Sequence, residues 1–331
     1  MTNNPLLILL GAAVLGGCAG SSATGGPSRQ TMFRGGPDHL GTYSEPTGPE
    51  LVGLQWRFDT EGGVFSTPAI SGDTVWVGSG DGRLYAVDLV TGTQRWATSL
   101  GSPVSSSPAV VGDRVIVGTI DGRFHAVHST TGAIQWQVST GPELPLPWGH
   151  ESGDVWTSSA VIAGDLAIVG AGDGFVHALE VASGKTRWKA QTGGRIRATP
   201  AAANGTVYVG AVDGVFYAFD LATGSPKWRF ETLGATLASG NFGYDRRTIQ
   251  SSAAVAGNTV VFGARDGIMY AVSAASGALR WKMDHEISWV NGSPAIANGV
   301  VYVGSSDGQF FQAVELETGR EIWRTPVGSS V

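Results

Sequence analysis

Apolar and polar residues alternate in short runs along most of the chain, and the runs come in pairs. Residues 74–78 (TVWVG) and 83–87 (RLYAV) form one such pair, separated by an Asp-Gly dipeptide at 81–82. Alternation with a period of two is typical of β-strands, and Asp-Gly between two strands indicates a hairpin turn of the primed type. The pattern therefore predicts many short antiparallel strands.

The same pair of runs recurs along the chain, each time followed by a segment that ends in tryptophan. The first of these segments is AVDLVTGTQRW. The six segments cover residues 86–96, 126–136, 178–188, 218–228, 271–281 and 313–323. Units of about forty residues with four short strands each are typical of β-propeller blades. The chain is thus predicted to be an all-β propeller of four-stranded antiparallel blades, with small-residue inner strands such as STPAI (66–70) near the axis and tryptophan-bearing fourth strands at the rim.

One tryptophan precedes the first full repeat. Trp56 lies forty residues before Trp96 and in register with it, so residues 54–58 are predicted to form an isolated fourth strand. Six complete blades plus this orphan N-terminal strand are expected. Residues 327–331 resemble the beginning of another repeat, and we expect seven blades in the natural ring. The alternative is a closed ring of six blades with a spare edge strand.

The repeat has a recognisable motif. The pattern A-x-D-x-x-T-G-x-x-x-W, matched fully at 86–96 and 218–228, resembles the tryptophan-docking motif of the PQQ (pyrroloquinoline quinone) propeller repeat, and residues 32–43 resemble the segment that opens many bacterial PQQ-like propellers. Asp88 and Asp220 are expected to brace the Thr-Gly turn. The resemblance implies that each tryptophan packs on the neighbouring blade. This docking role is expected for Trp56, Trp96, Trp136, Trp188, Trp228, Trp281 and Trp323.

The N-terminus has the pattern of a secreted lipoprotein. Residues 6–17 are apolar and end in small residues just before Cys18, the only cysteine, and residues 15–18 (LGGC) resemble a bacterial lipobox. We predict a signal peptide at 1–17, lipidation of Cys18, a flexible tether at 18–30 and a propeller domain at 31–331. The alternative is a buried N-terminal apolar segment. Ala19 favours the outer membrane, with the protein facing the periplasm.

Charge and composition exclude several classes of function. The net charge of −6 and the absence of a Lys/Arg cluster argue against a nucleic-acid partner. The family resemblance raises an enzymatic alternative, a dehydrogenase with PQQ and calcium on the propeller axis. That class implies an adjacent-cysteine disulfide, which a single cysteine cannot form, and no Asp/Glu/Asn cluster has calcium-ligand spacing. We expect no catalytic residue, no metal site, and neither PQQ nor calcium as a cofactor.

Two insertions interrupt the repeat, at 141–153 and 233–248. Both follow the fourth strand of a blade, so they are expected on the face that carries the Asp-Gly turns. Their aromatic and arginine residues have the composition of interface hot spots. The alternative is that both insertions are tolerated surface loops. The candidate partner-binding residues in the insertions are Trp148, His150, Glu151, Phe242, Tyr244, Arg246 and Arg247.

A second variable column lies at the start of the innermost strand. It is expected at the mouth of the central channel on the insertion-bearing face, and Trp289 lies close to it in sequence. Trp156, Arg197 and Trp289 therefore join the candidate partner-binding residues. The whole column consists of Phe65, Ser105, Trp156, Arg197, Gln250 and Asn291.

These patterns favour a non-catalytic, membrane-anchored scaffold of the bacterial envelope that binds a protein or peptide partner. The anchor and the fold are similar to those of the BamB lipoproteins, which implies a role in outer-membrane protein assembly. One alternative is the PQQ-dependent dehydrogenase. Another is a polysaccharide or small-ligand binder that stacks its ligand on Trp148, Trp156 and Trp289.

Overall fold

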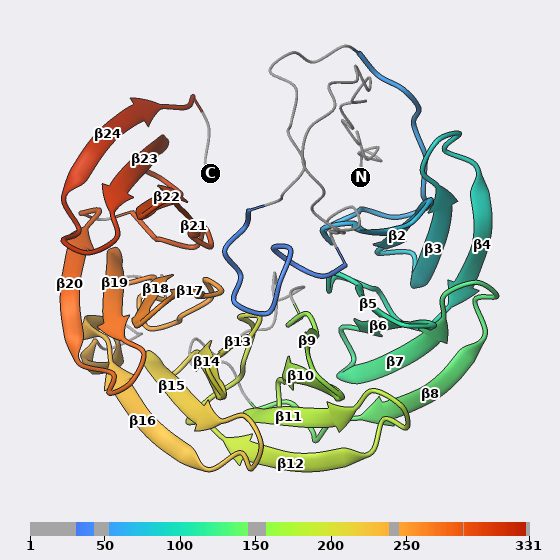
Figure 1. Cartoon of the computed structure of the whole chain (residues 1–331), viewed down its shortest axis with the longest axis horizontal. Coiled ribbons are helices and arrows are strands. Elements are labelled where there is room, and N and C mark those ends of the chain that lie inside the picture. Colours follow the sequence, from blue (N-terminus) through green and yellow to red (C-terminus); the bar gives the residue numbers. More distant parts are fainter. Residues whose placement is uncertain (1–30, 43–52, 145–156, 238–244, 287, 329–331) are drawn as a thin grey trace, which may run out of the picture.

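The chain folds into six sheets arranged around a common axis. The computed structural model describes residues 31–42, 53–144, 157–237, 245–286 and 288–328. Each sheet has four antiparallel strands that pair in chain order, with the first strand near the centre and the fourth at the rim (Figure 1). The predicted propeller with six complete blades is confirmed. Within the described ranges, no helix is long and apolar enough to cross a membrane.

Every blade has an inner strand of three residues, a second strand of five and two outer strands of six. The first blade comprises β1 (Ala69–Ser71), β2 (Thr74–Gly78), β3 (Arg83–Asp88) and β4 (Gln94–Ser99). The second comprises β5 (Ala109–Val111), β6 (Arg114–Gly118), β7 (Arg123–His128) and β8 (Ile134–Ser139). The third comprises β9 (Val161–Ala163), β10 (Leu166–Gly170), β11 (Phe175–Glu180) and β12 (Thr186–Gln191).

The other three blades repeat this plan. The fourth comprises β13 (Ala201–Ala203), β14 (Thr206–Gly210), β15 (Val215–Asp220) and β16 (Pro226–Glu231). A short 3-10 turn, η1 (Leu233–Thr236), follows it. The fifth comprises β17 (Ala254–Ala256), β18 (Thr259–Gly263), β19 (Ile268–Ser273) and β20 (Leu279–Asp284). The sixth comprises β21 (Ala295–Ala297), β22 (Val300–Gly304), β23 (Phe310–Glu315) and β24 (Glu321–Pro326).

The first and fourth strands differ from their predicted lengths. The fourth strand was expected to end at tryptophan, but β4 continues three residues beyond Trp96 because Thr98 still pairs with Leu84. The inner strand was expected at 66–70, but β1 begins only at Ala69. The Ser66 hydroxyl group bonds both the N–H and the C=O of Gly78 at 3.0 Å, so a side chain takes the place of backbone pairing there.

The Asp-Gly turns also differ from the expected primed type. In the first blade only Gly82 has positive φ (84°), and its N–H donates to the C=O of Ser79. The turn therefore ends in a left-handed glycine, whereas a primed turn needs positive φ at one or both of its central residues, here Gly80 and Asp81. The Asp81 carboxylate accepts the N–H of Arg83 at 2.9 Å, which explains why aspartate precedes the glycine.

At the rim, tryptophan locks one blade onto the next. The Trp96 indole N–H donates to the C=O of Ser129 in the following blade at 3.0 Å. The ring lies on Gly132, where an added Cβ would fall 2.9 Å from the indole, so glycine is required in this Thr-Gly turn. The corresponding indole bonds join Trp56 to Leu89, Trp136 to Val181, Trp188 to Leu221, Trp228 to Ala274 and Trp281 to Leu316.

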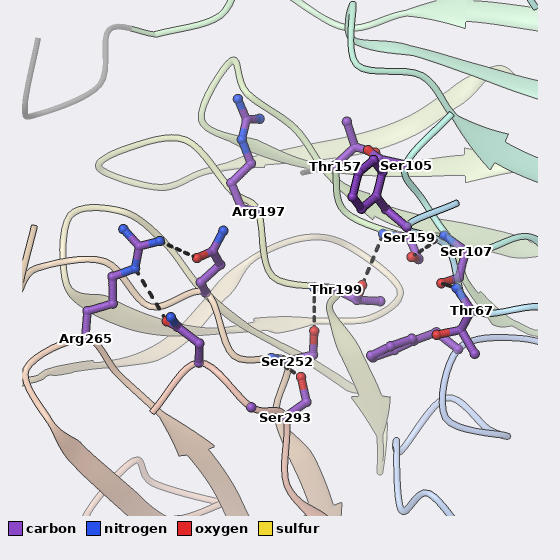
Figure 2. Close-up of a pocket in the computed structure, with 15 residues that line it drawn as sticks. Thr67, Ser105, Ser107, Thr157, Ser159, Arg197, Thr199, Ser252, Arg265 and Ser293 are labelled. Atoms are coloured by element: carbon purple, nitrogen blue, oxygen red, sulfur yellow. Dashed lines mark hydrogen bonds between the residues drawn. The ribbon is translucent and has the colours of Figure 1, made fainter. Parts of the chain in front are cut away.

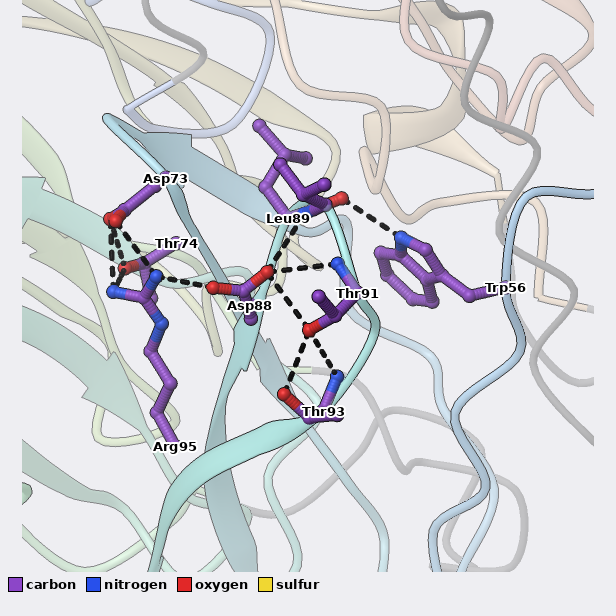
Figure 3. A network of polar contacts seen from close by, with 9 residues as sticks. Trp56, Asp73, Thr74, Asp88, Leu89, Thr91, Thr93 and Arg95 are labelled. Carbon is purple, nitrogen blue, oxygen red and sulfur yellow. Dashed lines mark hydrogen bonds and ion pairs between the residues drawn. The ribbon is translucent and has the colours of Figure 1, made fainter.

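Aspartate braces the turn that receives the indole, as predicted. Asp88 accepts the N–H groups of Val90 and Thr91 and the Thr91 hydroxyl group (Figure 3). The Arg95 guanidinium group bonds the other Asp88 oxygen at 2.6 Å and holds the pKa of this carboxyl group far below its ordinary value. Asp220 makes the same contacts in the fourth blade, to Ala222 and Thr223.

Apolar cores fill the space between adjacent blades. The core between the fourth and fifth blades contains Phe216 and Phe262, whose rings stack with centroids 3.9 Å apart. Tyr208 from β14 and Tyr270 from β19 belong to the same core. Each blade therefore buries the face that meets a neighbouring blade.

The described sheets leave a gap between the sixth blade and the first (Figure 1). Trp56 docks on the first blade as expected, although residues 54–58 form no strand with the described sheets, because no third strand lies beside them there. Trp323, the last docking tryptophan, is 42% exposed and makes no hydrogen bond with the described chain, so its predicted docking contact is absent there. Its ring contacts Tyr302 and Phe311 of its own blade. The seventh blade stays a prediction.

Residues 31–42, which we call the strap, run across the centre of the ring (Figure 1). Carbonyl groups of the strap accept N–H groups from the inner strands of four blades. His39 is fully buried, and its Nδ1 donates to the C=O of Ala253 at 3.1 Å. The strap bonds run from Val110 N to Thr31 O, Ala202 N to Pro37 O, Val255 N to Asp38 O and Ile296 N to Leu40 O.

Candidate functional site

A cavity of about 430 Å³ lies on the axis, lined mainly by the residues that precede the six inner strands. Phe65, Ser105, Arg197, Gln250 and Asn291 all lie on its wall. This is where the variable column was expected. Trp156, the remaining member of the column, lies outside the described residues.

Below this column, hydroxyl groups link the blades in a ladder (Figure 2). In each step the backbone N–H of one blade donates to a Ser or Thr hydroxyl of the next. The ladder explains why a small hydroxyl residue precedes each inner strand. The bonds run from Thr67 N to Ser107 Oγ (2.9 Å), Ser107 N to Ser159 Oγ (2.9 Å), Ser159 N to Thr199 Oγ1 (3.1 Å), Thr199 N to Ser252 Oγ (2.9 Å) and Ser252 N to Ser293 Oγ (3.0 Å).

The first insertion is tied to the cavity wall by an ion-pair cluster. Glu143 lies 2.7 Å from Arg195 and 2.8 Å from Arg197. The two arginines are 3% and 8% exposed, so these charges are largely removed from water. The Arg195 guanidinium group also bonds the C=O of Leu144. A buried charge of this kind is tolerated only when it is paired, so the cluster holds the start of the insertion in place.

The second insertion is tied to the wall in the same way. Arg265, from the turn between β18 and β19, pairs with the buried carboxylate of Asp245 at 3.3 Å. It also donates to Gln250 Oε1 at 2.6 Å and to Asn291 Oδ1 at 3.4 Å (Figure 2). Its guanidinium group lies 4.6 Å from the centre of the Trp289 ring, a cation-π contact.

Each insertion also packs on the Asp-Gly turn of the next blade, so both lie on the face predicted for them. Gly141 N donates to Asp173 at 2.8 Å, and Gly234 N donates to Asp266 at 2.9 Å. Burial raises the pKa of the Asp266 carboxyl group, although the Gly234 N–H donates to it.

The two adjacent arginines of the second insertion make structural contacts. Arg246 donates to the C=O of Asp266 at 2.8 Å, and Arg247 donates to the C=O of Ala235 at 3.1 Å. Both side chains are half-buried. Replacing them would disturb the insertion itself, so they are poor probes of a partner surface. The other insertion candidates, Trp148, His150, Glu151, Phe242 and Tyr244, lie outside the described residues, as does Cys18.

The buried pair of His177 and Asp173 in the third blade has a structural explanation. His177 lies 3.0 Å from Asp173, and Tyr270 occupies the same slot and bonds Asp266 at 2.7 Å. His177 therefore repeats what tyrosine does elsewhere. His125, in the same slot, is fully buried, and burial lowers its pKa to about 4.

The described cavity wall does not fit a calcium ion. Calcium requires several oxygen ligands, usually including carboxylates, and the wall residues include neither Asp nor Glu. Within the described residues, no three His, Cys, Asp or Glu side chains are grouped to hold a metal.

Sequence reasoning identified Arg197 but missed Arg265, Glu143 and Asp245. A signal for Arg265 exists, because it is the only charged residue at the position before the Asp-Gly pair in the six repeats. Glu143 and Asp245 carried no such signal, since insertions have no equivalent in the other blades.

Comparison with known proteins assigns the family. A family model described as outer membrane protein assembly factor BamB matches residues 39–147 and 147–331. The chain belongs to this family. The family match agrees with the PQQ-like repeat found in the sequence. No curated protein matches the chain.

Solved structures share the fold of this family member. The crystal structure of BamB from Moraxella catarrhalis is 21% identical, with a TM-score of 0.69, and the match covers 85% of this chain and 82% of that one. The quinohemoprotein alcohol dehydrogenase of Comamonas testosteroni is 12% identical, with a TM-score of 0.66 and coverage of 92% and 74%. A europium-containing methanol dehydrogenase is 16% identical, with a TM-score of 0.65 and coverage of 86% and 74%. At these identities the likeness concerns the fold, and one fold can host unrelated functions.

Proposed function

We propose that this protein is a non-catalytic scaffold, anchored in the bacterial outer membrane through Cys18 and facing the periplasm, that captures a protein partner. The partner binds on the face that carries the Asp-Gly turns and both insertions. By family, the proposed role is in the assembly of outer-membrane proteins.

The observation that carries this proposal is that both insertions are built onto the mouth of the cavity. Glu143 joins the first to Arg195 and Arg197, and Asp245 joins the second to Arg265. Loops that are merely tolerated have no need of ion pairs at their base that involve buried charged groups such as Arg195, Arg197 and Asp245. The described parts of the insertions also expose apolar side chains, with Leu233 51% and Leu144 36% exposed. Exposed apolar groups beside charged pairs are typical of interaction surfaces.

Site-specific photocrosslinking in intact cells tests this face. A photoreactive residue at Leu144 or Leu233 should give one discrete adduct with an envelope protein. Ile134 and Leu279 are 46% and 47% exposed on outer strands and serve as matched rim positions that should give no such adduct. Equal adducts at all four positions, or none, would contradict the proposal.

The anchor has its own test. Cys18→Ser should release the protein from the membrane fraction into the periplasm, because a thioether-linked lipid is the proposed attachment. Unchanged partitioning after separation of the two membranes would remove the anchor from the proposal.

A second candidate is a PQQ-dependent dehydrogenase, favoured by the fold shared with quinohemoprotein and methanol dehydrogenases. It predicts a visible absorbance change when the full chain is titrated with PQQ and calcium. The absence of carboxylates among the described wall residues argues against it.

A further inference from the structure

The central cavity presents many hydrogen-bond donors. The described residues of its wall combine hydroxyl, amide and guanidinium side chains with two phenylalanines and include no carboxylate. What such a wall attracts depends on which of its polar atoms are already used within the protein.

Each hydroxyl group of the ladder uses one of its two lone pairs within the protein. Ser107, Ser159, Thr199, Ser252 and Ser293 each accept a backbone N–H from a neighbouring blade. A hydroxyl group has one proton and two lone pairs, and a hydroxyl that accepts still has its proton to give. Within the described chain, none of these five protons meets a protein acceptor. They are therefore available to a molecule in the cavity.

The two amide side chains of the wall, Gln250 and Asn291, are also held so that they present donors. Arg265 donates to the oxygens of Gln250 and Asn291 at 2.6 and 3.4 Å. A guanidinium group cannot accept a hydrogen bond, so the amide oxygens must face it and the NH₂ groups are turned elsewhere. Both amides thus offer the cavity donors.

The charged side chains are arranged so that the cationic groups line the cavity. Arg197 and Arg265 belong to the cavity wall, whereas their carboxylate partners, Glu143 and Asp245, do not. Phe33 of the strap is also part of the wall, and the strap crosses the ring beneath the ladder. A ligand therefore enters from the insertion-bearing face and meets cationic and neutral donors.

We propose that this cavity binds a carboxylate-bearing ligand rich in hydrogen-bond acceptors. Its volume of about 430 Å³ lies within the range of small-molecule sites. The carboxylates come either from a free small polycarboxylate or from the acidic end of a polypeptide. The site stands on the donors of the wall and does not depend on the partner proposed above.

Calorimetric titration of the purified full chain tests the site. The probes are propane-1,2,3-tricarboxylate and a hexaglutamate peptide, at about 0.15 M salt. At least one should bind saturably, with a dissociation constant of about 0.1 mM or tighter. The triamide of the tricarboxylate has the same shape without charge and should bind about tenfold more weakly or not at all. Failure of both acidic probes, or equal binding of the triamide, would overturn the proposal.

Isosteric variants locate the binding. The double variant Gln250→Glu, Asn291→Asp keeps the oxygens that face Arg265 but replaces both NH₂ donors by acceptors. It should lower the affinity for the acidic probe by about tenfold or more. Asn258→Asp is the matched control, because it adds the same kind of charge at an exposed turn where the Ala275 N–H still finds its acceptor. It should leave binding unchanged. Wild-type affinity in the double variant would place the ligand elsewhere and refute the site.

A second variant guards against misfolding of the first. Arg197→Gln removes one cation from the wall, while Glu143 keeps its pair with Arg195 at 2.7 Å. This variant should also lower the affinity for the acidic probe, while its circular dichroism spectrum stays unchanged. Binding of the tricarboxylate alone would identify a small molecule as the source of the carboxylates. Stronger binding of hexaglutamate would identify a polypeptide as that source. A chain that binds either probe but gives no crosslink would retain this site and contradict the partner proposal.

Discussion

The rim and the axis of the ring join the same neighbouring blades by different chemistry. At the rim, an indole ring such as that of Trp188 lies on a glycine turn of the next blade and adds one hydrogen bond, to Leu221. At the axis, the contact is one backbone bond to a hydroxyl, such as Ser107 N to Ser159, reinforced by the strap. The rim has the larger apolar contact, whereas the axis places polar groups toward a cavity. Stability and binding chemistry are thus separated in space.

The largest effect should come from the rim. Trp188→Ala removes a side chain in a residue only 8% exposed and should lower the free energy of unfolding by about 3 to 5 kcal/mol. Trp323→Ala makes the same change at the same repeat position. Because Trp323 is 42% exposed, this variant should lower the free energy of unfolding by less than about 1 kcal/mol. Urea denaturation of both variants measures the difference. Similar losses would show that docking on the next blade is not what makes the tryptophan stabilising.

A smaller effect should come from the strap at the axis. Burial lowers the pKa of His39 to about 3 from 6.5, with Arg34 nearby adding to the shift. The unfolded chain therefore binds a proton that the folded chain refuses, so stability is present above pH 6.5 and is lost as the pH falls toward 3. Each such group contributes a slope of about 1.4 kcal/mol per pH unit.

The variant His39→Asn retains a donor for Ala253 and removes this titration. Unfolding free energies measured between pH 6 and 5 should show a slope about 1.4 kcal/mol per pH unit shallower than in the wild type. The remaining slope belongs to groups such as His125 and His285, whose pKa values burial lowers to about 4. An unchanged slope would mean that His39 is protonated in the folded protein.

The smallest effect should come from the ladder. Ser159→Ala leaves the N–H of Ser107 without its acceptor and should lower the free energy of unfolding by about 1 kcal/mol. Ser99→Ala, on an exposed position of β4, is the rim control and should change it by less than about 0.5 kcal/mol. Urea midpoints of the two variants provide the comparison. A loss at Ser159 as large as at Trp188 would end the distinction between rim and axis.

The predictions from sequence succeeded where the contact is local or repeated. The six blades, the docking of Trp96 and the brace at Asp88 all follow from residues that recur at fixed spacing. The Asp-Gly turns were placed correctly but given the wrong type, because the dipeptide suits both a primed turn and a turn that ends in left-handed glycine. The strand expected at 54–58 depended on a neighbouring strand, which the described chain does not place there.

The site was predicted only in part. The variable column led to Arg197 on the cavity wall, because repeat register alone locates a residue along the blade. The contacts of Arg246 with the Asp-Gly turn at Asp266 and of Arg247 with its own insertion were not foreseen, and an interface composition cannot distinguish them from partner contacts.

The sequence alone determined the blade, its strands and the order of its interfaces, since each depends on spacing within a repeat of about forty residues. Only the tertiary structure decided the chemistry of the cavity. Asn291 turns its amide oxygen toward Arg265 of the preceding blade, and Ser159 accepts the N–H of Ser107, fifty-two residues away. Hydrogen bonds between neighbouring blades settle such choices, and no spacing within one blade contains them.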